Sequence, residues 1–116
     1  MSMADFLART QILVGDQGIE RLDRSHVFLA GLGGVGAYAA EALVRAGVGK
    51  LTMIDMDEVS SSNINRQLLA LESTVGHPKV DVMKDRIIKI NAQCQVRGEK
   101  VFLNADNVKE WIVEDK

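Results

Sequence analysis

Several residue types are scarce in this chain, and each scarcity excludes a class of protein. Its 116 residues include one cysteine, Cys94, so no intramolecular disulfide can form, and a buried structural thiol in a reducing cytoplasm is predicted. The 14 basic and 16 acidic residues nearly balance, which gives no sign of a nucleic-acid or membrane surface. No apolar run reaches the roughly 18 residues of a membrane span, and the first ten residues lack the apolar stretch of a secretory signal. The only histidines, His26 and His77, have no metal-ligand spacing, so no metal ligand is predicted.

The apolar residues that are present, 47% of the chain, follow the periods of strands and helices. Three strands are predicted, at residues 26–31, 50–55 and 94–101. Four helices are predicted, at residues 16–23, 34–46, 77–91 and 106–113. The first two strands are apolar enough to be buried on both faces of a sheet. Pro78 suits the first helical position of the third helix, and Asn104 or Asp106 suits the cap of the fourth.

The alternation of strands and helices predicts the fold. Right-handed crossovers then give a Rossmann-like parallel sheet with helices on both faces. Doubly wound nucleotide folds usually continue with further strands after a third helix. Residues 1–116 are therefore interpreted as a single nucleotide-binding domain that is truncated at its C-terminal end, the N-terminal half of a larger doubly wound domain.

A glycine-rich segment lies between the first strand and the following helix. Gly31, Gly33 and Gly36 have the G-x-G-x-x-G spacing, and Gly34 adds a fourth glycine. These glycines permit a tight turn, let a phosphate approach the backbone and let the helix pack closely on the sheet. Asp55 ends the next strand, where a carboxylate can accept hydrogen bonds from ribose hydroxyls. The pattern predicts a nucleotide site but does not decide between NAD and ATP.

The segment after Asp55 favours a polyphosphate over a redox dinucleotide. Two cations, Arg66 and Lys79, follow on a polar loop and on the next helix, and both can offset the charge of a departing pyrophosphate. A lysine in the first turn of a helix is mildly unfavourable, which favours a functional role for Lys79. A NAD-binding redox module and a catalytically inactive dimerisation module remain as alternatives.

Four segments, in this order and at this spacing, resemble the ubiquitin-activating-enzyme superfamily of adenylating enzymes: GLGGVG, AGVGKLTMIDMDEV, SNINRQ and TVGHPKV. This superfamily includes the molybdopterin-synthase and thiamine-biosynthesis adenylyltransferases, and the resemblance covers about residues 9–100. It implies binding of MgATP and transfer of AMP to a carboxylate, with release of pyrophosphate. Residues 63–96 are most similar to the tRNA threonylcarbamoyladenosine dehydratases, which implies a tRNA substrate that is activated and then cyclised. The alternative substrate is the C-terminal carboxylate of a ubiquitin-like sulfur carrier.

The resemblance also implies roles for single residues. The nucleotide-binding set comprises Gly31, Gly33, Gly34, Gly36, Asp55, Asp57 and Asn63. The catalytic set comprises Arg66 and Lys79, which bind the polyphosphate, and Arg9, which a second subunit delivers in a homodimer. The main magnesium-binding aspartate of the family follows a later strand, so it is expected outside these 116 residues, and the isolated segment is expected to be inactive.

Overall fold

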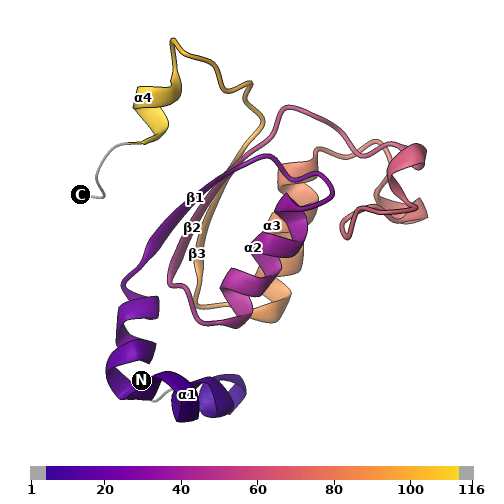
Figure 1. Ribbon diagram of the computed structural model, residues 1–116. Coiled ribbons are helices and arrows are strands. Elements are labelled where there is room, and N and C mark those ends of the chain that lie inside the picture. Colours follow the sequence, from indigo (N-terminus) through magenta and orange to yellow (C-terminus); the bar gives the residue numbers. More distant parts are fainter. Residues whose placement is uncertain (1–4, 113–116) are drawn as a thin grey trace.

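The computed structural model describes residues 5–112 and shows a three-stranded parallel sheet with helices around it (Figure 1). In chain order the elements are η1 (Asp5–Leu7), α1 (Ala8–Asp23), β1 (His26–Ala30), α2 (Gly36–Arg45), β2 (Lys50–Ile54), η2 (Ser61–Asn63), η3 (Glu72–Thr74), α3 (Lys79–Ile90), β3 (Gln95–Glu99) and α4 (Val108–Trp111). The strand order in the sheet is β1-β2-β3, and Leu51 lies between Val27 and Val96 in the register. The predicted Rossmann-like α/β fold is confirmed.

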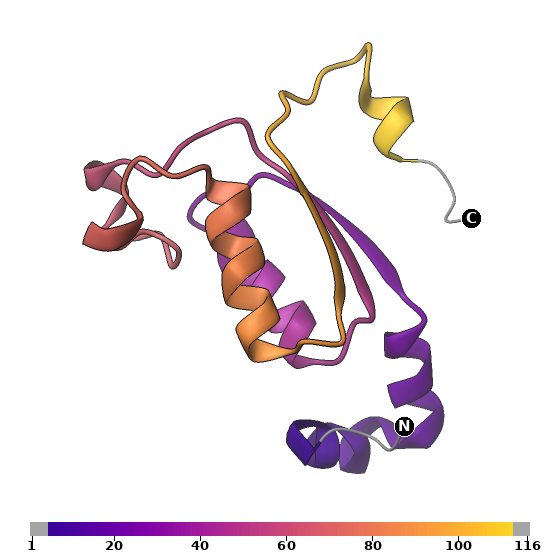
Figure 2. The ribbon, with the colours of Figure 1, turned by 180° about the vertical axis from the view of Figure 1, so that it is seen from behind.

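Helices α2 and α3 lie side by side on one face of the sheet (Figures 1 and 2). Side chains of the central strand β2 alternate between the two faces, and Leu51 and Met53 belong to the fully buried cluster under these helices. The same cluster holds Ala37 and Ala40 of α2 and Ile87 of α3. Small alanine side chains let α2 approach the sheet closely. This packing fixes the start of α2 directly above the carboxyl end of β1.

The opposite face of the sheet carries the short helix α4. The ring of Trp111 stacks on the ring of Phe28 in β1, with the centroids 6.5 Å apart. The guanidinium carbon of Arg97 in β3 lies 4.7 Å from the centroid of the Trp111 ring, a distance at which the cation is attracted to the aromatic face. Helices therefore lie on both faces of the sheet, as predicted.

Helix α1 begins earlier than predicted. The sequence indicates a helix from residue 16, whereas the structure has helix from Ala8 to Asp23 with a break at Gly15, whose φ is 72°. Glycine adopts this left-handed conformation without a side-chain clash. Before the break, Ile12 and Leu13 are 82% and 86% exposed. The sequence prediction relies on an apolar stripe that packs on the core. The first half of α1 has no such stripe, so it was not predicted.

Three smaller predictions are corrected by the structure. Strand β1 is only partly buried, because it is an edge strand of the described sheet with β2 as its sole strand partner. Helix α3 begins at Lys79, one residue after Pro78. The last helix is limited to Val108–Trp111 and is flanked by Asn107, so neither Asn104 nor Asp106 is its cap. The Asn104 carboxamide oxygen instead accepts the N–H groups of Asp106 and Asn107 in the turn before the helix. The predicted end of this helix at residue 113 lies outside the described residues.

A charged contact joins α2 to α3. The carboxylate of Glu41 accepts hydrogen bonds from the guanidinium of Arg86 and, at 3.2 Å, from that of Arg45. The hydrogen bond from Arg86 lowers the pKa of Glu41 although partial burial opposes the shift. The pair links the two helices that cover the core.

We expect Glu41→Gln to reduce the free energy of unfolding by about 1 kcal/mol at pH 7, a modest effect because the partly exposed Arg86 is screened by solvent. The pKa of Glu41 is lower in the folded than in the unfolded chain, so its contribution is present above the ordinary glutamate pKa and is lost as the pH falls through the lowered value. Urea unfolding at pH 7 and at pH 3 measures the difference. The exposed Glu72 provides the control, Glu72→Gln. A gap between Glu41→Gln and the parent that does not narrow as the pH falls from 7 toward 3 would contradict the assignment.

Candidate functional site

Two of the four clustered glycines are required by the fold itself. The glycine loop, residues 31–36, joins β1 to α2 at the carboxyl edge of the sheet (Figure 1). Gly31 has a φ of 95°, and its N–H donates to the carbonyl of Ile54 at 2.8 Å. A Cβ on Gly36 would lie 1.9 Å from the carbonyl oxygen of Gly31, a contact that no side chain can make. Any residue with a side chain would distort the loop at either position.

The fold makes no such demand at the other two glycines. A Cβ on Gly34 would meet no atom within 4 Å, and a Cβ on Gly33 would lie 3.9 Å from Nε2 of Gln67, which is ordinary van der Waals contact. Neither residue has a positive φ. The loop therefore keeps an open space where two side chains would fit. Such a space allows a ligand to approach the backbone.

The same loop presents backbone donors that are not used within the chain. In the part of the chain that the structure describes, the N–H groups of Gly33, Gly34 and Val35 make no hydrogen bond. Helix α2 starts at Gly36 without a side-chain cap. Free N–H groups and the positive end of a helix dipole attract an anion, above all a phosphate. The loop has the form of a phosphate cradle.

Asp55 ties this loop to the next segment of the site. Its Oδ2 accepts the N–H of Leu32 at 2.7 Å, and its Oδ1 accepts the N–H of Asp57 at 2.8 Å. Each carboxylate oxygen has a second lone pair, so the oriented group can still accept hydroxyl donors. A cavity of about 310 Å³ lies beside it, lined by residues 30–31, 54–57 and 101–103. The cavity has the size of a small-molecule site.

Lys79 is buried at the start of α3, although its place in the first turn favours a solvated side chain. It is 5% exposed, and its ammonium lies 4.0 Å from Oδ2 of Asp57. The backbone N–H of Lys79 donates to the carbonyl of Asp57 at 3.0 Å, which fixes the two residues side by side. The carboxylate of Asp57 is mostly exposed, so it offsets a buried positive charge only weakly. The site thus holds a cation that an anionic ligand would neutralise.

The other two predicted residues of the polar loop differ in burial. Asn63 is buried, and its carboxamide oxygen accepts the N–H of Ser60 at 3.0 Å. Arg66 is exposed, and its guanidinium donates to the carbonyl of Ser62 at 3.0 Å and to the carboxamide of Asn65 at 2.9 Å. The guanidinium of Arg66 is thus held by its own loop in this structure.

Arg9 does not join these residues within one chain. It is an exposed residue of α1, and this helix lies at the amino ends of the strands, at the opposite edge of the sheet from the glycine loop (Figure 1). Its delivery by a second subunit stays a prediction.

The structure adds Gln67 to the site, a residue that the sequence interpretation did not select. It is 8% exposed, and its carboxamide lies beside Gly33. Polar residues on a polar loop are usually solvated, so composition gave no signal. Its position directly after Arg66 in the SNINRQ segment was the one available indication.

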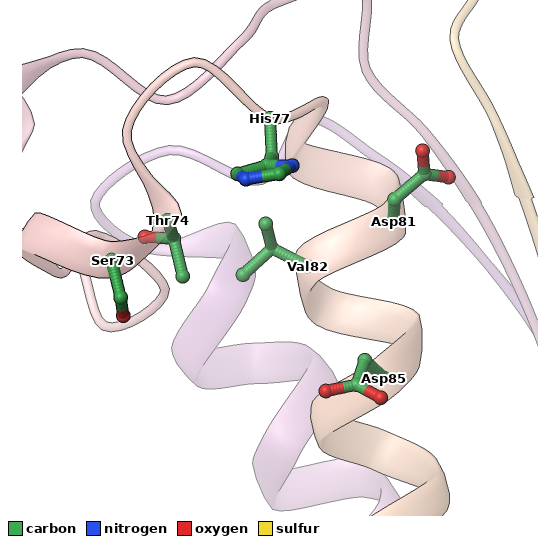
Figure 3. Close-up of a pocket in the computed structure, with 6 residues that line it drawn as sticks. All are labelled: Ser73, Thr74, His77, Asp81, Val82 and Asp85. Atoms are coloured by element: carbon green, nitrogen blue, oxygen red, sulfur yellow. The ribbon is translucent and has the colours of Figure 1, made fainter.

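A second cavity, of about 250 Å³, lies between the 72–74 turn and α3 (Figure 3). In this view the His77 ring lies over Val82, between the turn that carries Thr74 and the helix that carries Asp85. Carboxylates line the cavity, so it repels phosphate, and the hydroxyl of Thr74 is already engaged with the carbonyl of Leu69 at 2.8 Å. This second cavity lacks the features of the glycine loop.

The described part of the chain contains neither a cluster of metal-ligating side chains nor an activated thiol. Among residues 5–112, no three His, Cys, Asp or Glu side chains are placed to hold a metal ion. His26 bonds through Nε2 to the hydroxyl of Thr52 at 2.7 Å. Cys94 is buried as predicted, and burial raises the pKa of its thiol, which keeps it protonated at neutral pH. No helix within these residues has the length and apolarity to cross a membrane.

Comparison with known proteins decides the family. The profile of the ThiF family matches residues 7–114, nearly the whole chain. The chain belongs to the ThiF family. The predicted membership in this group of adenylating enzymes is thereby confirmed.

Two curated ThiF-type relatives illustrate the range of similarity. The tRNA threonylcarbamoyladenosine dehydratase of Bacillus subtilis is 47% identical over 104 residues, which cover 90% of this chain and 41% of the relative. The molybdopterin-synthase adenylyltransferase of Escherichia coli is 40% identical over 97 residues, which cover 84% of this chain and 39% of the relative. This ThiF-family chain thus spans about two fifths of the length of these relatives.

The solved structures agree with this ThiF assignment. The E. coli tRNA threonylcarbamoyladenosine dehydratase, crystallised in complex with ATP, superposes with a TM-score of 0.91 at 39% identity, over 97% of this chain and 48% of that chain. The same enzyme has also been solved in complex with AMP, with a TM-score of 0.89. The chain therefore has the fold of the part of this enzyme that it covers, about half of that chain.

Proposed function

We propose that this chain is the nucleotide-binding part of an ATP-dependent adenylating enzyme, and that the enzyme acts in the dehydration and cyclisation of threonylcarbamoyladenosine in tRNA. The observation that carries the nucleotide assignment is the glycine loop, where unused N–H groups border the open space at Gly33 and Gly34. The tRNA assignment is supported by the 47% identity to the Bacillus subtilis dehydratase.

The phosphates, the ribose and the purine of ATP are each assigned to a different group of the described residues. The loop N–H groups of Gly33 and Gly34 face phosphate oxygens, and the carboxylate of Asp55 accepts the ribose hydroxyls. The cavity beside Asp55 is lined on one side by residues 101–103, whose apolar side chains suit the flat face of a purine. Asp57 stands next to the ribose position and beside Lys79.

ATP supplies the electrophilic α-phosphate and pyrophosphate as the leaving group. A substrate carboxylate oxygen forms the new bond to the α-phosphorus while the bond to the bridging oxygen breaks, so that an acyl adenylate and pyrophosphate result. Lys79 offsets the negative charge that develops on the departing oxygen, in a site where burial strengthens the attraction. Asn63 lies near the phosphates, and Arg66 exchanges its bonds within its own loop for a phosphate contact. The chain contributes positioning and charge, without a covalent step of its own.

The described residues do not themselves form a magnesium site, because residues 5–112 contain no group of three suitable side chains. We therefore assign no step to a metal held by this chain. The expectation that the main magnesium ligand lies elsewhere in the full-length protein is part of the proposal.

Activation of a ubiquitin-like sulfur carrier is the second candidate function. It is favoured by the 40% identity to the molybdopterin-synthase adenylyltransferase of Escherichia coli. Both functions use the same ATP site and differ in the carboxylate that attacks.

The decisive experiment uses the full-length encoded protein. With tRNA that carries threonylcarbamoyladenosine, we expect ATP to be consumed and the modified base to lose water. The parallel reaction with a sulfur-carrier protein, followed by ATP–pyrophosphate exchange, tests the second function. Thermal stabilisation by NAD but not by ATP would contradict both and favour a redox module.

We further propose a homodimer in which Arg9 enters the ATP site of the partner, since α1 is remote from its own glycine loop. Arg9→Ala and Lys79→Met are each expected to be inactive alone in the full-length protein. Mixed under conditions that allow subunit exchange, they form heterodimers with one intact site, so about a quarter of the parent activity is expected if half of the dimers are mixed. Arg24→Ala, an exposed arginine of the same region, is the control. A mixture that stays inactive although the subunits exchange would refute delivery in trans.

A further inference from the structure

We propose that Gln67 is a positioning residue of the nucleotide site, and that its side-chain carboxamide completes its hydrogen bonds only when ATP fills the glycine loop. The inference rests on the proposed function and extends it to a residue outside the set that the sequence suggested.

The carboxamide of Gln67 is buried with an unmet hydrogen-bonding need. The residue is 8% exposed, and in the described part of the chain its buried Oε1 has no hydrogen-bond partner. A buried carbonyl oxygen without a donor is unfavourable and uncommon in folded proteins. The backbone on either side is fixed, because the N–H of Gln67 donates to Asn63 at 2.9 Å and its carbonyl accepts from Ala70 at 3.0 Å. The backbone of Gln67 is thus fixed in a turn, while the Oε1 atom of its side chain has no donor.

The position of the group indicates what its partner is. Its Nε2 lies 3.9 Å from the place that a Cβ of Gly33 would occupy, and Oε1 is bonded to the same carbon. Both atoms therefore lie beside the glycine loop, where the N–H groups of Gly33 and Gly34 are also unpaired. A carboxamide has both a donor and an acceptor. It can accept one of the three unpaired loop N–H groups through Oε1 while Nε2 donates to a phosphate oxygen, which leaves the other loop N–H groups for the phosphate.

Binding of phosphate at the loop would therefore also fix the position of the Gln67 carboxamide. Gln67 is adjacent to Arg66 in the chain, and its N–H is bonded to Asn63. A carboxamide that pairs with the ligand-bound glycine loop positions the two predicted phosphate-binding residues. In this arrangement Gln67 acts through its neighbours and through the loop.

The test compares Gln67→Met with the parent in the full-length protein. Methionine has a similar length and volume but neither donor nor acceptor. We expect the melting temperature of the ligand-free variant to be unchanged or higher, because an unpaired buried oxygen has been removed. The Kd for ATP, measured by calorimetry, is expected to rise about 10-fold because a hydrogen bond of the bound state is lost. Gln95→Met, at an exposed position near the amino end of β3, is the matched control and should change neither value.

Each result decides the proposal. A lower melting temperature with an unchanged Kd for ATP would show a purely structural role and overturn it. If Gln67→Met does not fold, Gln67→Asn, which withdraws the carboxamide by one methylene, must show the same loss of ATP affinity, and a parent-like Kd overturns the proposal. A parent protein that binds no ATP overturns the proposed function as well. Parent binding with an unaffected Gln67→Met overturns only the role of Gln67.

Discussion

Replacement of Lys79 by methionine is expected to lower the ATP-dependent turnover of the full-length protein by about 100-fold or more, the effect of removing a group that stabilises developing charge. The structure gives the reason. The ammonium is buried, and its ion-pair partner in the described part of the chain is a largely exposed carboxylate 4.0 Å away, that of Asp57. Methionine fills the same space without the charge. The initial rate of pyrophosphate release at saturating ATP measures the loss.

The same variant should fold at least as well as the parent. A buried charge that is weakly compensated contributes little to stability, and its replacement by an apolar side chain is often neutral or stabilising. The exposed Lys84 of the same helix provides the control, Lys84→Met, which should keep full turnover. If Lys79→Met retains turnover near that of Lys84→Met, Lys79 is a structural residue and the charge argument is wrong.

The second large effect separates the glycines of the loop into two kinds. Gly36→Ala is expected to destabilise the fold by about 3 kcal/mol or more, because the added methyl would lie against a backbone carbonyl that cannot yield. That methyl would be 1.9 Å from the oxygen of Gly31. Gly34→Ala adds its methyl where no atom lies within 4 Å, so the melting temperature should not fall. ATP affinity should nevertheless drop about tenfold or more, equivalent to roughly 1.4 kcal/mol, because the methyl occupies the phosphate cradle.

Thermal unfolding and ATP calorimetry on the two variants test this separation. The two substitutions add the same methyl two residues apart, so each variant serves as the control for the other. Equal destabilisation by both would mean that the space at Gly34 is closed in the folded protein. Unchanged ATP binding by Gly34→Ala would place the phosphates elsewhere.

The parts of the fold with a local signal were predictable from the sequence. The apolar segments of β1 and β2 and the apolar stripe of α3 locate these elements to within a few residues. The glycine spacing and Asp55 locate the turn at the carboxyl edge of the sheet, because a parallel sheet brings consecutive strand ends together. The family followed from the same segments together with SNINRQ and TVGHPKV.

Features that depend on contacts between distant segments were not predictable. Lys79 is buried in the folded chain beside Asp57 of another segment, whereas its helix position suggests exposure. Gln67 looks like any polar loop residue until the glycine loop is placed beside it. The first half of α1 was missed for the opposite reason, since Ile12 and Leu13 are apolar but exposed. In each case the environment of the side chain, and not its type, sets its role.

The two backbone hydrogen bonds of Asp55 have a consequence for how the site can be studied by mutation. One carboxylate oxygen accepts the N–H of Leu32 and the other that of Asp57, so the side chain links two segments in addition to its proposed role as a ligand for the ribose. An asparagine there would turn an NH₂ donor against one of these N–H donors and push the segments apart. The loss of ATP affinity in such a variant would combine two effects, a displaced loop and a missing sugar contact. The sugar contact is better measured from the ligand side, with 2′-deoxy- and 3′-deoxy-ATP on the unaltered protein.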